Sequence, residues 1–341
     1  MTGSGVLDFR SDTVTKPDDR MRAAMAAAEV GDDVLDGDPT MRALEEKAAE
    51  LLGVEAALWV PSGSMGNLVA LFLHLRPGDR FLAPAQAHVL ESEVGTASWL
   101  AGGMAHPLPW RPDLPGAVSA EDVRAVATAA GPYFALRTTL LCVENTHNAA
   151  GGTVVPPDAY ARLTDTAHEL GLTVHLDGAR VWHAAVALGV KPAELTRGAH
   201  TVQACLSKGL GAPVGSVVGG SAAFVDEARR VRKMLGGGVR QGGVLAAAGL
   251  VALDTVDRLA DDHENARLLA EGLSALGWDV TEPQTNIVMA RVPDVTGTVD
   301  RLAAAGVLTV PVGGRVRLMT HRDVSRGDVR TALERIAPLA L

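Results

Sequence analysis

Short apolar runs alternate with longer amphipathic stretches along most of the chain. The runs have the length of buried strands, and the stretches between them have the spacing of helices that cover a sheet. The expected strands are 56–60, 80–83, 139–143, 172–176, 202–206 and 214–218, and the expected helices are 39–52, 66–75, 120–130 and 157–170. This alternation predicts an α/β fold with a mostly parallel sheet and helices on both faces.

The pattern changes after residue 242. The expected elements there are a helical region to about 276, strands at 278–282, 285–292 and 316–320, and a helix near 298–305. These elements predict a smaller α+β domain. We therefore divide the chain into an N-terminal segment (1–20), a large domain (21–245) and a small C-terminal domain (246–341).

Composition and charge narrow the class of protein. The 341 residues are 47% apolar and carry a formal net charge of −9, which indicates a folded protein with little attraction for nucleic acid or anionic membranes. The longest apolar run, 244–253, is too short to cross a bilayer, and the first residues lack the pattern of a signal peptide. Cys142 and Cys205 form no disulfide framework. A cytoplasmic protein is the expectation.

One lysine follows a buried strand at a position that suggests covalent chemistry. Lys208 comes just after the run 202–206, and Asp177 follows the run 172–176; sites in such sheets lie at the carboxyl ends of strands. A lysine beside apolar strands loses its proton more readily and forms a Schiff base with an aldehyde. A carboxylate keeps a pyridine nitrogen protonated. The pair indicates pyridoxal 5′-phosphate, whose ring withdraws electrons from a carbanion.

Two further features fit that cofactor. Gly63, Ser64 and Met65 lie between the strand 56–60 and a helix, where backbone amides favour a phosphate; an ordinary N-capped turn is the alternative. His88 offers a flat ring for stacking, although a lone histidine is usually structural. No G-x-G-x-x-G or G-x-x-x-x-G-K-[ST] motif follows an expected strand, which disfavours a nicotinamide-dependent oxidoreductase.

Many short motifs, taken together, resemble the threonine aldolase and beta-eliminating lyase family of fold-type I pyridoxal-phosphate enzymes. The matching segments are 9–15, 31–34, 38–40, 61–64, 144–148, 177–180, 206–211, 232–234, 236–241 and 317–321. The resemblance covers nearly the whole chain and implies a seven-stranded sheet with a smaller C-terminal domain. It also implies a lyase that cleaves L-threonine, L-allo-threonine or a related β-hydroxy-α-amino acid to glycine and an aldehyde.

The resemblance implies a role for each matching residue. The catalytic residues would be Lys208, which holds the cofactor covalently, Asp177, which binds its pyridinium nitrogen, and His88, which stacks on its ring. The other cofactor-binding residues would be Gly63, Ser64, Met65, Arg180 and Arg240, and the substrate-binding residues would be Ser11, Arg180, Arg317 and Lys233. Arg240 would reach the phosphate of a neighbouring subunit in a homodimer or homotetramer, and segment 1–20 would contribute to the site. No metal is expected.

Two departures from the family bear on the substrate. Phe134 stands where many members carry a histidine that handles the β-hydroxyl, and Leu35-Asp36-Gly37 replaces a frequent Tyr-Gly-Asp. A phenyl ring cannot exchange a proton, so the base is His88 or an ordered water, or the preferred substrate differs from threonine. The alternatives are β-elimination or racemisation on the same cofactor, and a non-catalytic binding module, which the presence of Lys208 and Asp177 disfavours.

Overall fold

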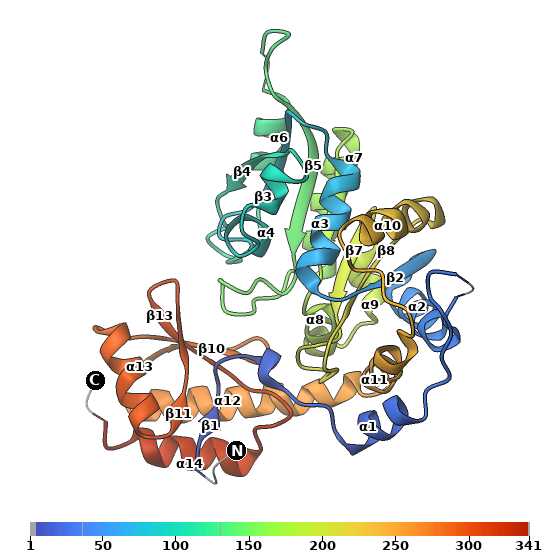
Figure 1. Cartoon of the computed structure of the whole chain (residues 1–341). Coiled ribbons are helices and arrows are strands. Elements are labelled where there is room, and N and C mark those ends of the chain that lie inside the picture. Colours follow the sequence, from blue (N-terminus) through green and yellow to red (C-terminus); the bar gives the residue numbers. More distant parts are fainter. Residues whose placement is uncertain (1–4, 36, 130, 340–341) are drawn as a thin grey trace.

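A seven-stranded sheet forms the centre of the larger part of the molecule (Figure 1). The structure is a computed structural model and describes residues 5–35, 37–129 and 131–339. In spatial order the strands are β2 (Ala56–Val60), β8 (Ser216–Gly220), β7 (Thr201–Cys205), β6 (Thr173–Asp177), β5 (Arg137–Glu144), β3 (Asp79–Pro84) and β4 (Met104–Leu108). β8 is antiparallel to both of its neighbours, and the remaining pairs are parallel. The predicted α/β class is confirmed.

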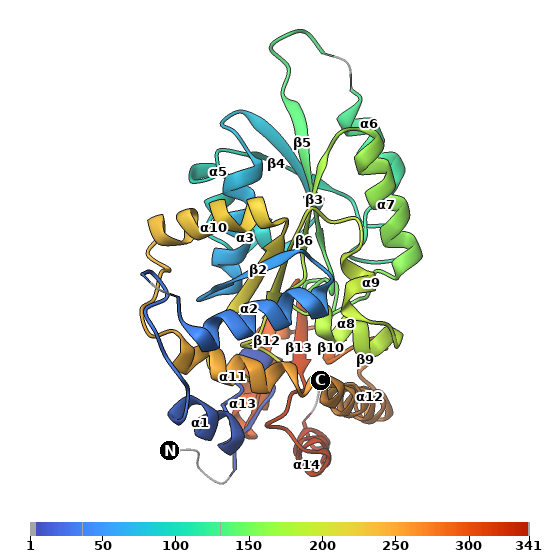
Figure 2. The ribbon, with the colours of Figure 1, turned by 90° about the vertical axis from the view of Figure 1, so that its right-hand side faces the viewer.

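Helices cover both faces of this sheet (Figure 2). On one face lie α3 (Gly63–His74), α4 (His88–Glu91), α5 (Thr96–Trp99) and α10 (Ala222–Met234), and on the other lie α2 (Pro39–Leu52), α6 (Ala120–Ala127), α7 (Pro157–Glu169), α8 (Val181–Leu188), α9 (Pro192–Thr196) and α11 (Gly243–Leu253). The apolar α11 packs against α2 and α1 (Asp19–Ala26). None of the described helices is both long and apolar enough to cross a membrane.

Two local differences from the sequence expectations affect the neighbourhood of the site. α3 begins at Gly63 rather than at residue 66, because the Ser62 hydroxyl accepts from Met65 N at 3.2 Å and caps the helix earlier. β4 was not predicted, since it is a largely exposed edge strand that contains Pro107. The last residue of the predicted helix 120–130 and the outer ends of segments 1–20 and 246–341 lie outside the described residues.

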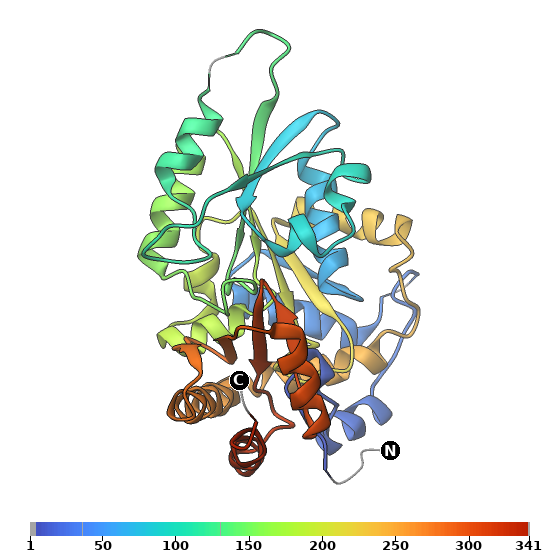
Figure 3. The same ribbon diagram turned by 90° about the vertical axis from the view of Figure 1, so that its left-hand side faces the viewer.

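The smaller part of the molecule is built on an antiparallel sheet (Figure 3, orange to red). The strands of this sheet lie in the order β12 (Val310–Val312), β13 (Arg315–Met319), β10 (Ile287–Arg291) and β9 (Asp279–Thr281). The same part of the molecule contains the helices α12 (Leu259–Ala275), α13 (Val295–Ala304) and α14 (Arg326–Ile336). The N-terminal segment belongs to this part, because β1 (Leu7–Asp8) pairs with β11 (Val307–Leu308) and Phe9 lies in its core.

The hydrophobic packing changes from one part to the other within α12. Leu253 and Leu259 belong to the cluster of the large sheet, whereas the cluster of the small sheet includes Ala266 and the residues that follow along α12. This change comes later than the predicted boundary at residue 246. The division into domains itself stays a prediction.

Candidate active site

Lys208 and Asp177 lie where two neighbouring parallel strands end. Asp177 is the last residue of β6 and pairs in register with Gln203 of β7, and Lys208 follows β7 by three residues. The Asp177 side chain is buried and accepts hydrogen bonds from Asn67 Nδ2 at 2.8 Å and from Ala179 N at 3.1 Å. Lys208 is half-buried. The structure thus brings the two residues to one edge of the sheet, as predicted for an α/β site.

The turn that carries Lys208 is held through its backbone. Thr15 Oγ1 donates to the carbonyl oxygen of Lys208 at 2.9 Å, which ties the N-terminal segment to the turn. Gly209 leaves room for a neighbouring ring, because a Cβ there would lie 2.4 Å from His183 Nε2. Gly211 has φ +84°, a left-handed conformation that favours glycine. These contacts fix the backbone of the turn 208–211, and none of them involves the Lys208 side chain.

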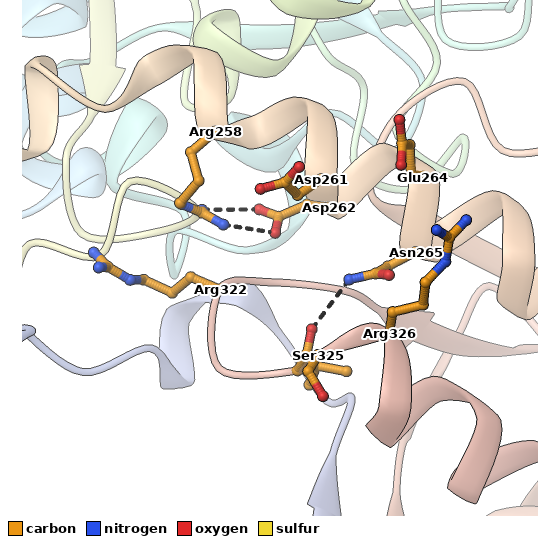
Figure 4. Close-up of a pocket in the computed structure, with 9 residues that line it drawn as sticks. Arg258, Asp261, Asp262, Glu264, Asn265, Arg322, Ser325 and Arg326 are labelled. Carbon is orange, nitrogen blue, oxygen red and sulfur yellow. Dashed lines mark hydrogen bonds and ion pairs between the residues drawn. The ribbon is translucent and has the colours of Figure 1, made fainter.

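Two arginines support the same turn from a pocket of about 360 Å³ between α12 and α14 (Figure 4). Arg258 Nη2 donates to Gly209 O at 2.7 Å, and Arg322 Nη1 donates to Leu210 O at 3.2 Å. Arg258 is in turn held by Asp262 through bonds of 2.9 and 3.1 Å. The pocket therefore lies behind the turn, and two of its charged side chains bind the backbone that follows Lys208.

The predicted phosphate site lies at the start of α3. The backbone amides of Gly63 and Ser64 are in the first turn of the helix, where N–H groups have no partner within the helix. The segment 236–238 packs against this turn, since a Cβ on Gly237 would lie 2.4 Å from Met65 Sδ. The helix N-terminus thus directs backbone N–H donors toward an anion at the same end of the sheet as Asp177.

His88 forms a polar cluster with Glu93 and Asp177. Glu93 Oε1 accepts from His88 Nδ1 at 2.7 Å and from Asn67 Nδ2 at 2.8 Å. Possible ligand atoms of His88, Glu93 and Asp177 lie within 4.8 Å of one another. A cation among them would face the amide hydrogens of Asn67, which point at both carboxylates. The direction of these hydrogens therefore disfavours a metal ion among the three side chains.

Replacing Glu93 by glutamine is expected to lower the pKa of His88. The hydrogen bond to Glu93 is the main cause that raises the pKa of the His88 imidazole above 6.5, and burial of the ring opposes it. Without the carboxylate, only the weaker attraction of Asp177 would favour the imidazolium. Histidine NMR titration of the cofactor-free protein measures this pKa. A His88 pKa that is equal in the wild type and in E93Q would contradict the assigned pairing.

Arg317 lies on β13 with unused hydrogen-bonding capacity. Its Nη1 donates to Asn148 Oδ1 and its Nη2 to Arg10 O, each at 2.9 Å, whereas its buried Nε has no partner among the described residues. Burial lowers the pKa of Arg317 to about 10, which leaves it charged at neutral pH. A buried cation with a free donor is suited to bind a carboxylate.

Arg180 is arranged differently from Arg317. Asp12 binds its Nε and Nη2, each at 2.8 Å, and both side chains are buried. Its Nη1 donates to Asn148 Oδ1 at 3.3 Å, and its Nη2 also lies 3.6 Å from Met319 Sδ. Arg180 and Arg317 thus meet at Asn148, but one edge of Arg180 is already neutralised. Of the two arginines, Arg317 has more capacity for a substrate carboxylate.

The remaining predicted residues fall into two groups. Ser11 precedes the 3-10 helix Asp12–Val14, where its hydroxyl accepts from Thr13 N at 3.2 Å, and it adjoins the Arg10 carbonyl that Arg317 binds. Lys233 and Arg240 are exposed and lie by the 32–34 loop: Lys233 lines a pocket with Asp33 and Val34, and Arg240 Nη1 is 3.2 Å from Asp32 Oδ2. No described hydrogen bond or ion pair joins these two to Lys208 or Asp177.

Sequence reasoning missed four polar residues that organise the site. Asp12 and Asn148 belong to quoted motifs next to assigned residues, and Asn67 follows the predicted phosphate turn closely. Their types alone suggested no role. Glu93 had no sequence signal, because its contact with His88 depends on the short helix α4 and the turn after it.

Phe134, which stands where many family members carry a histidine, lies far from Lys208 within one chain. Phe134 is 75% exposed and precedes the amino end of β5, whereas Glu144, at the carboxyl end, accepts from His88 N at 2.7 Å. An eight-residue strand spans roughly 25 Å. Any contact of Phe134 with such a site therefore requires a second copy of the chain. Leu35 is also exposed, and Asp36 lies outside the described residues.

Comparison with known proteins shows the family of the chain. The beta-eliminating lyase family matches residues 8–294. The chain is 41% identical to low-specificity L-threonine aldolase 1 of Arabidopsis thaliana, with 96% of this chain and 94% of the relative covered. It is 42% identical to the low specificity L-threonine aldolase of Escherichia coli K12, with 94% and 95% covered.

A solved structure supports the fold independently. The threonine aldolase of Leishmania major superimposes with a TM-score of 0.82 and 20% identity, over 97% of this chain and 99% of that one. Together with the sequence relatives, this places the architecture among the fold-type I enzymes. The chain therefore belongs to the threonine aldolase and beta-eliminating lyase family, as its motifs predicted.

Proposed function

We propose that this chain is a pyridoxal 5′-phosphate-dependent aldolase that cleaves L-threonine, L-allo-threonine or a related β-hydroxy-α-amino acid to glycine and an aldehyde. The observation that carries the proposal is the position of Lys208 beside the buried Asp177 at adjacent strand ends. The threonine aldolases that match more than nine-tenths of the chain support the substrate class.

The residues at this edge of the sheet fit the parts of the cofactor. Lys208 would bind the aldehyde, Asp177 the ring nitrogen, and the first-turn amides of Gly63 and Ser64 the phosphate. Glu93 Oε2 and Arg317 Nε are buried without a hydrogen-bond partner among the described residues. Since buried polar atoms are normally paired, these two support a polar ligand in the site.

Each chain residue would contribute a separate part of the chemistry. When bound, the cofactor supplies a ring that withdraws the electron pair released as the substrate Cα–Cβ bond breaks. Arg317 would bind the substrate carboxylate through its free Nε and thereby orient that bond. Asp177 would keep a proton on the ring nitrogen. The amine of Lys208 would give way to the substrate amine and would then return a proton to Cα.

His88 is the candidate base for the β-hydroxyl. Because Glu93 binds Nδ1 of the ring, Nε2 remains to accept the hydroxyl proton, directly or through a water. Loss of that proton lets the aldehyde leave, and protonation at Cα gives glycine. Phe134 offers no alternative, because a phenyl ring cannot exchange a proton and the residue precedes the far end of β5.

Product analysis tests the proposal. The purified protein is supplied with pyridoxal phosphate and, in parallel, with L-threonine, L-allo-threonine and phenylserine. Glycine with acetaldehyde or benzaldehyde is the expected outcome. Ammonia with a 2-oxo acid would indicate β-elimination instead, and a changed stereoisomer with no cleavage would indicate racemisation; either result would overturn the proposed activity.

Replacing Arg317 by alanine is expected to raise KM for the amino acid by about a hundredfold, since a buried charge-assisted carboxylate contact is lost. Cofactor affinity should change by less than about threefold. Steady-state kinetics and cofactor titration measure the two effects. Arg315→Ala is a matched control, because Arg315 lies two residues away on β13 and donates to Ala149 O. Equal losses of substrate and cofactor affinity in R317A would show that Arg317 is misassigned.

We further propose that the enzyme is a homodimer or homotetramer with sites at subunit interfaces. Arg240 supports this, since its side chain is 54% exposed and pairs with Asp32 rather than with the start of α3. Exposed Leu35, Tyr133 and Phe134 support it as well, because large apolar side chains on a surface are typical of interfaces. The expectations that the partners are small amino-acid substrates and that the protein is cytoplasmic stay predictions.

A further inference from the structure

A line of polar side chains, four buried and one half-buried, runs from Asp177 toward the amino ends of the strands. Asn67 Nδ2 donates to Asp177 Oδ2 at 2.8 Å, and Asn67 Oδ1 lies 3.1 Å from His175 Nε2. His175 Nδ1 is 2.9 Å from Thr201 Oγ1, and this oxygen is 3.0 Å from His74 Nε2. We call these five residues the polar chain.

Strand register and helix spacing build the polar chain. His175 and Asp177 are two residues apart on β6 and point to the same face of the sheet, and Thr201 of β7 pairs with His175. Asn67 and His74 are about two turns apart on α3, so both face the sheet. Asn67, His175 and Thr201 are each at most 1% exposed, so water does not compete for their bonds.

The hydrogen-bonding groups determine where each proton lies. Both hydrogens on Asn67 Nδ2 go to carboxylates, so Asn67 Oδ1 accepts from His175 Nε2. Burial lowers the pKa of His175 to about 4, which leaves the ring neutral and Nδ1 without a hydrogen. Thr201 therefore donates to Nδ1, and its oxygen accepts from His74 Nε2. Apart from the second Asn67 hydrogen, which goes to Glu93, every donor in the polar chain points toward Asp177.

We propose that His175 is a positioning residue: its Nε2–H holds Asn67 in the orientation that donates to Asp177, so that this carboxylate stays aimed at the ring nitrogen. If the Asn67 amide turned over, its oxygen would face two carboxylates and Asp177 would lose a donor. Successive donors in one direction also strengthen one another. The inference rests on the proposed function, because it concerns the partner of a cofactor ring.

The protonation of the ring nitrogen provides a direct test. The holoenzyme is prepared with pyridoxal phosphate labelled with ¹⁵N in the pyridine ring, and the nitrogen shift is measured by NMR beside kcat. His175→Leu, which removes the donor, should move the shift toward that of the unprotonated nitrogen and lower kcat about tenfold. His175→Gln, which keeps an N–H for Asn67, should restore most of both. Thr201→Val should cause a smaller change in the same direction, about threefold in kcat.

The controls separate positioning from general loss of structure. His200→Gln alters a histidine next to Thr201 that accepts from Val174 N and lies outside the polar chain; it should leave the nitrogen shift unchanged. If H175L and T201V leave the shift of a folded, cofactor-loaded enzyme at the wild-type value, the inference is wrong. If the wild type itself fails to bind pyridoxal phosphate, the proposed function fails instead. The T201V change is isosteric, so the test stands even if H175L does not fold.

Discussion

Replacing Lys208 by alanine is expected to lower the rate of substrate cleavage by about 10⁴-fold or more, because the group that holds the cofactor covalently is lost. The absorbance of bound pyridoxal phosphate near the visible edge should disappear as well. Cleavage assays and an absorbance spectrum measure the two effects.

The protein should remain folded in this variant. The turn is held by bonds to the carbonyl oxygens of Lys208, Gly209 and Leu210 from Thr15, Arg258 and Arg322, and alanine retains all of these acceptors. An unchanged melting temperature would therefore separate loss of chemistry from loss of structure. A K208A enzyme that kept both its absorbance and its activity would end the assignment of Lys208.

Replacing Asp177 by asparagine is expected to lower kcat by about 10³-fold, because the side chain that keeps the ring nitrogen protonated loses its charge. The shape of the side chain is retained, although the new amide would compete with Asn67 Nδ2 for position. Steady-state kinetics at saturating cofactor measure the effect.

Glu93→Gln is the matched control for this prediction. Glu93 is a buried carboxylate that binds the same Asn67 amide group as Asp177 does. It acts through His88, so we expect a loss in kcat of less than about tenfold. Equal effects of D177N and E93Q on kcat would contradict the distinct role given to Asp177.

The fold was predictable where strands are buried on both faces. The runs that became β5, β6 and β7 are mostly buried and each contains several apolar residues, which is typical of parallel strands in a covered sheet. β4 was not predicted, because an edge strand that is exposed to solvent needs no apolar run. β1 and β11 were not predicted, because each has only two residues and their pairing joins segments about 300 residues apart in the chain.

The positions of Lys208 and Asp177 were predictable for a different reason. A residue that follows a buried strand in a parallel sheet lies at the carboxyl edge, whatever the rest of the structure is. Asn67, which links Asp177 to Glu93 and His175, was not predictable. Its partners are 110, 26 and 108 residues away in sequence, and they meet only when α3 packs on the sheet.

The most direct test of the account is to identify the lysine that binds pyridoxal phosphate. Reduction of the loaded protein with borohydride fixes the cofactor to the amine that holds it, and peptide mass spectrometry locates that amine. The candidates are Lys16, Lys47, Lys191, Lys208 and Lys233. We predict a single labelled peptide, the one that contains Lys208. Labelling at any of the other four lysines, or no labelling in a protein that cleaves its substrate, would contradict the account.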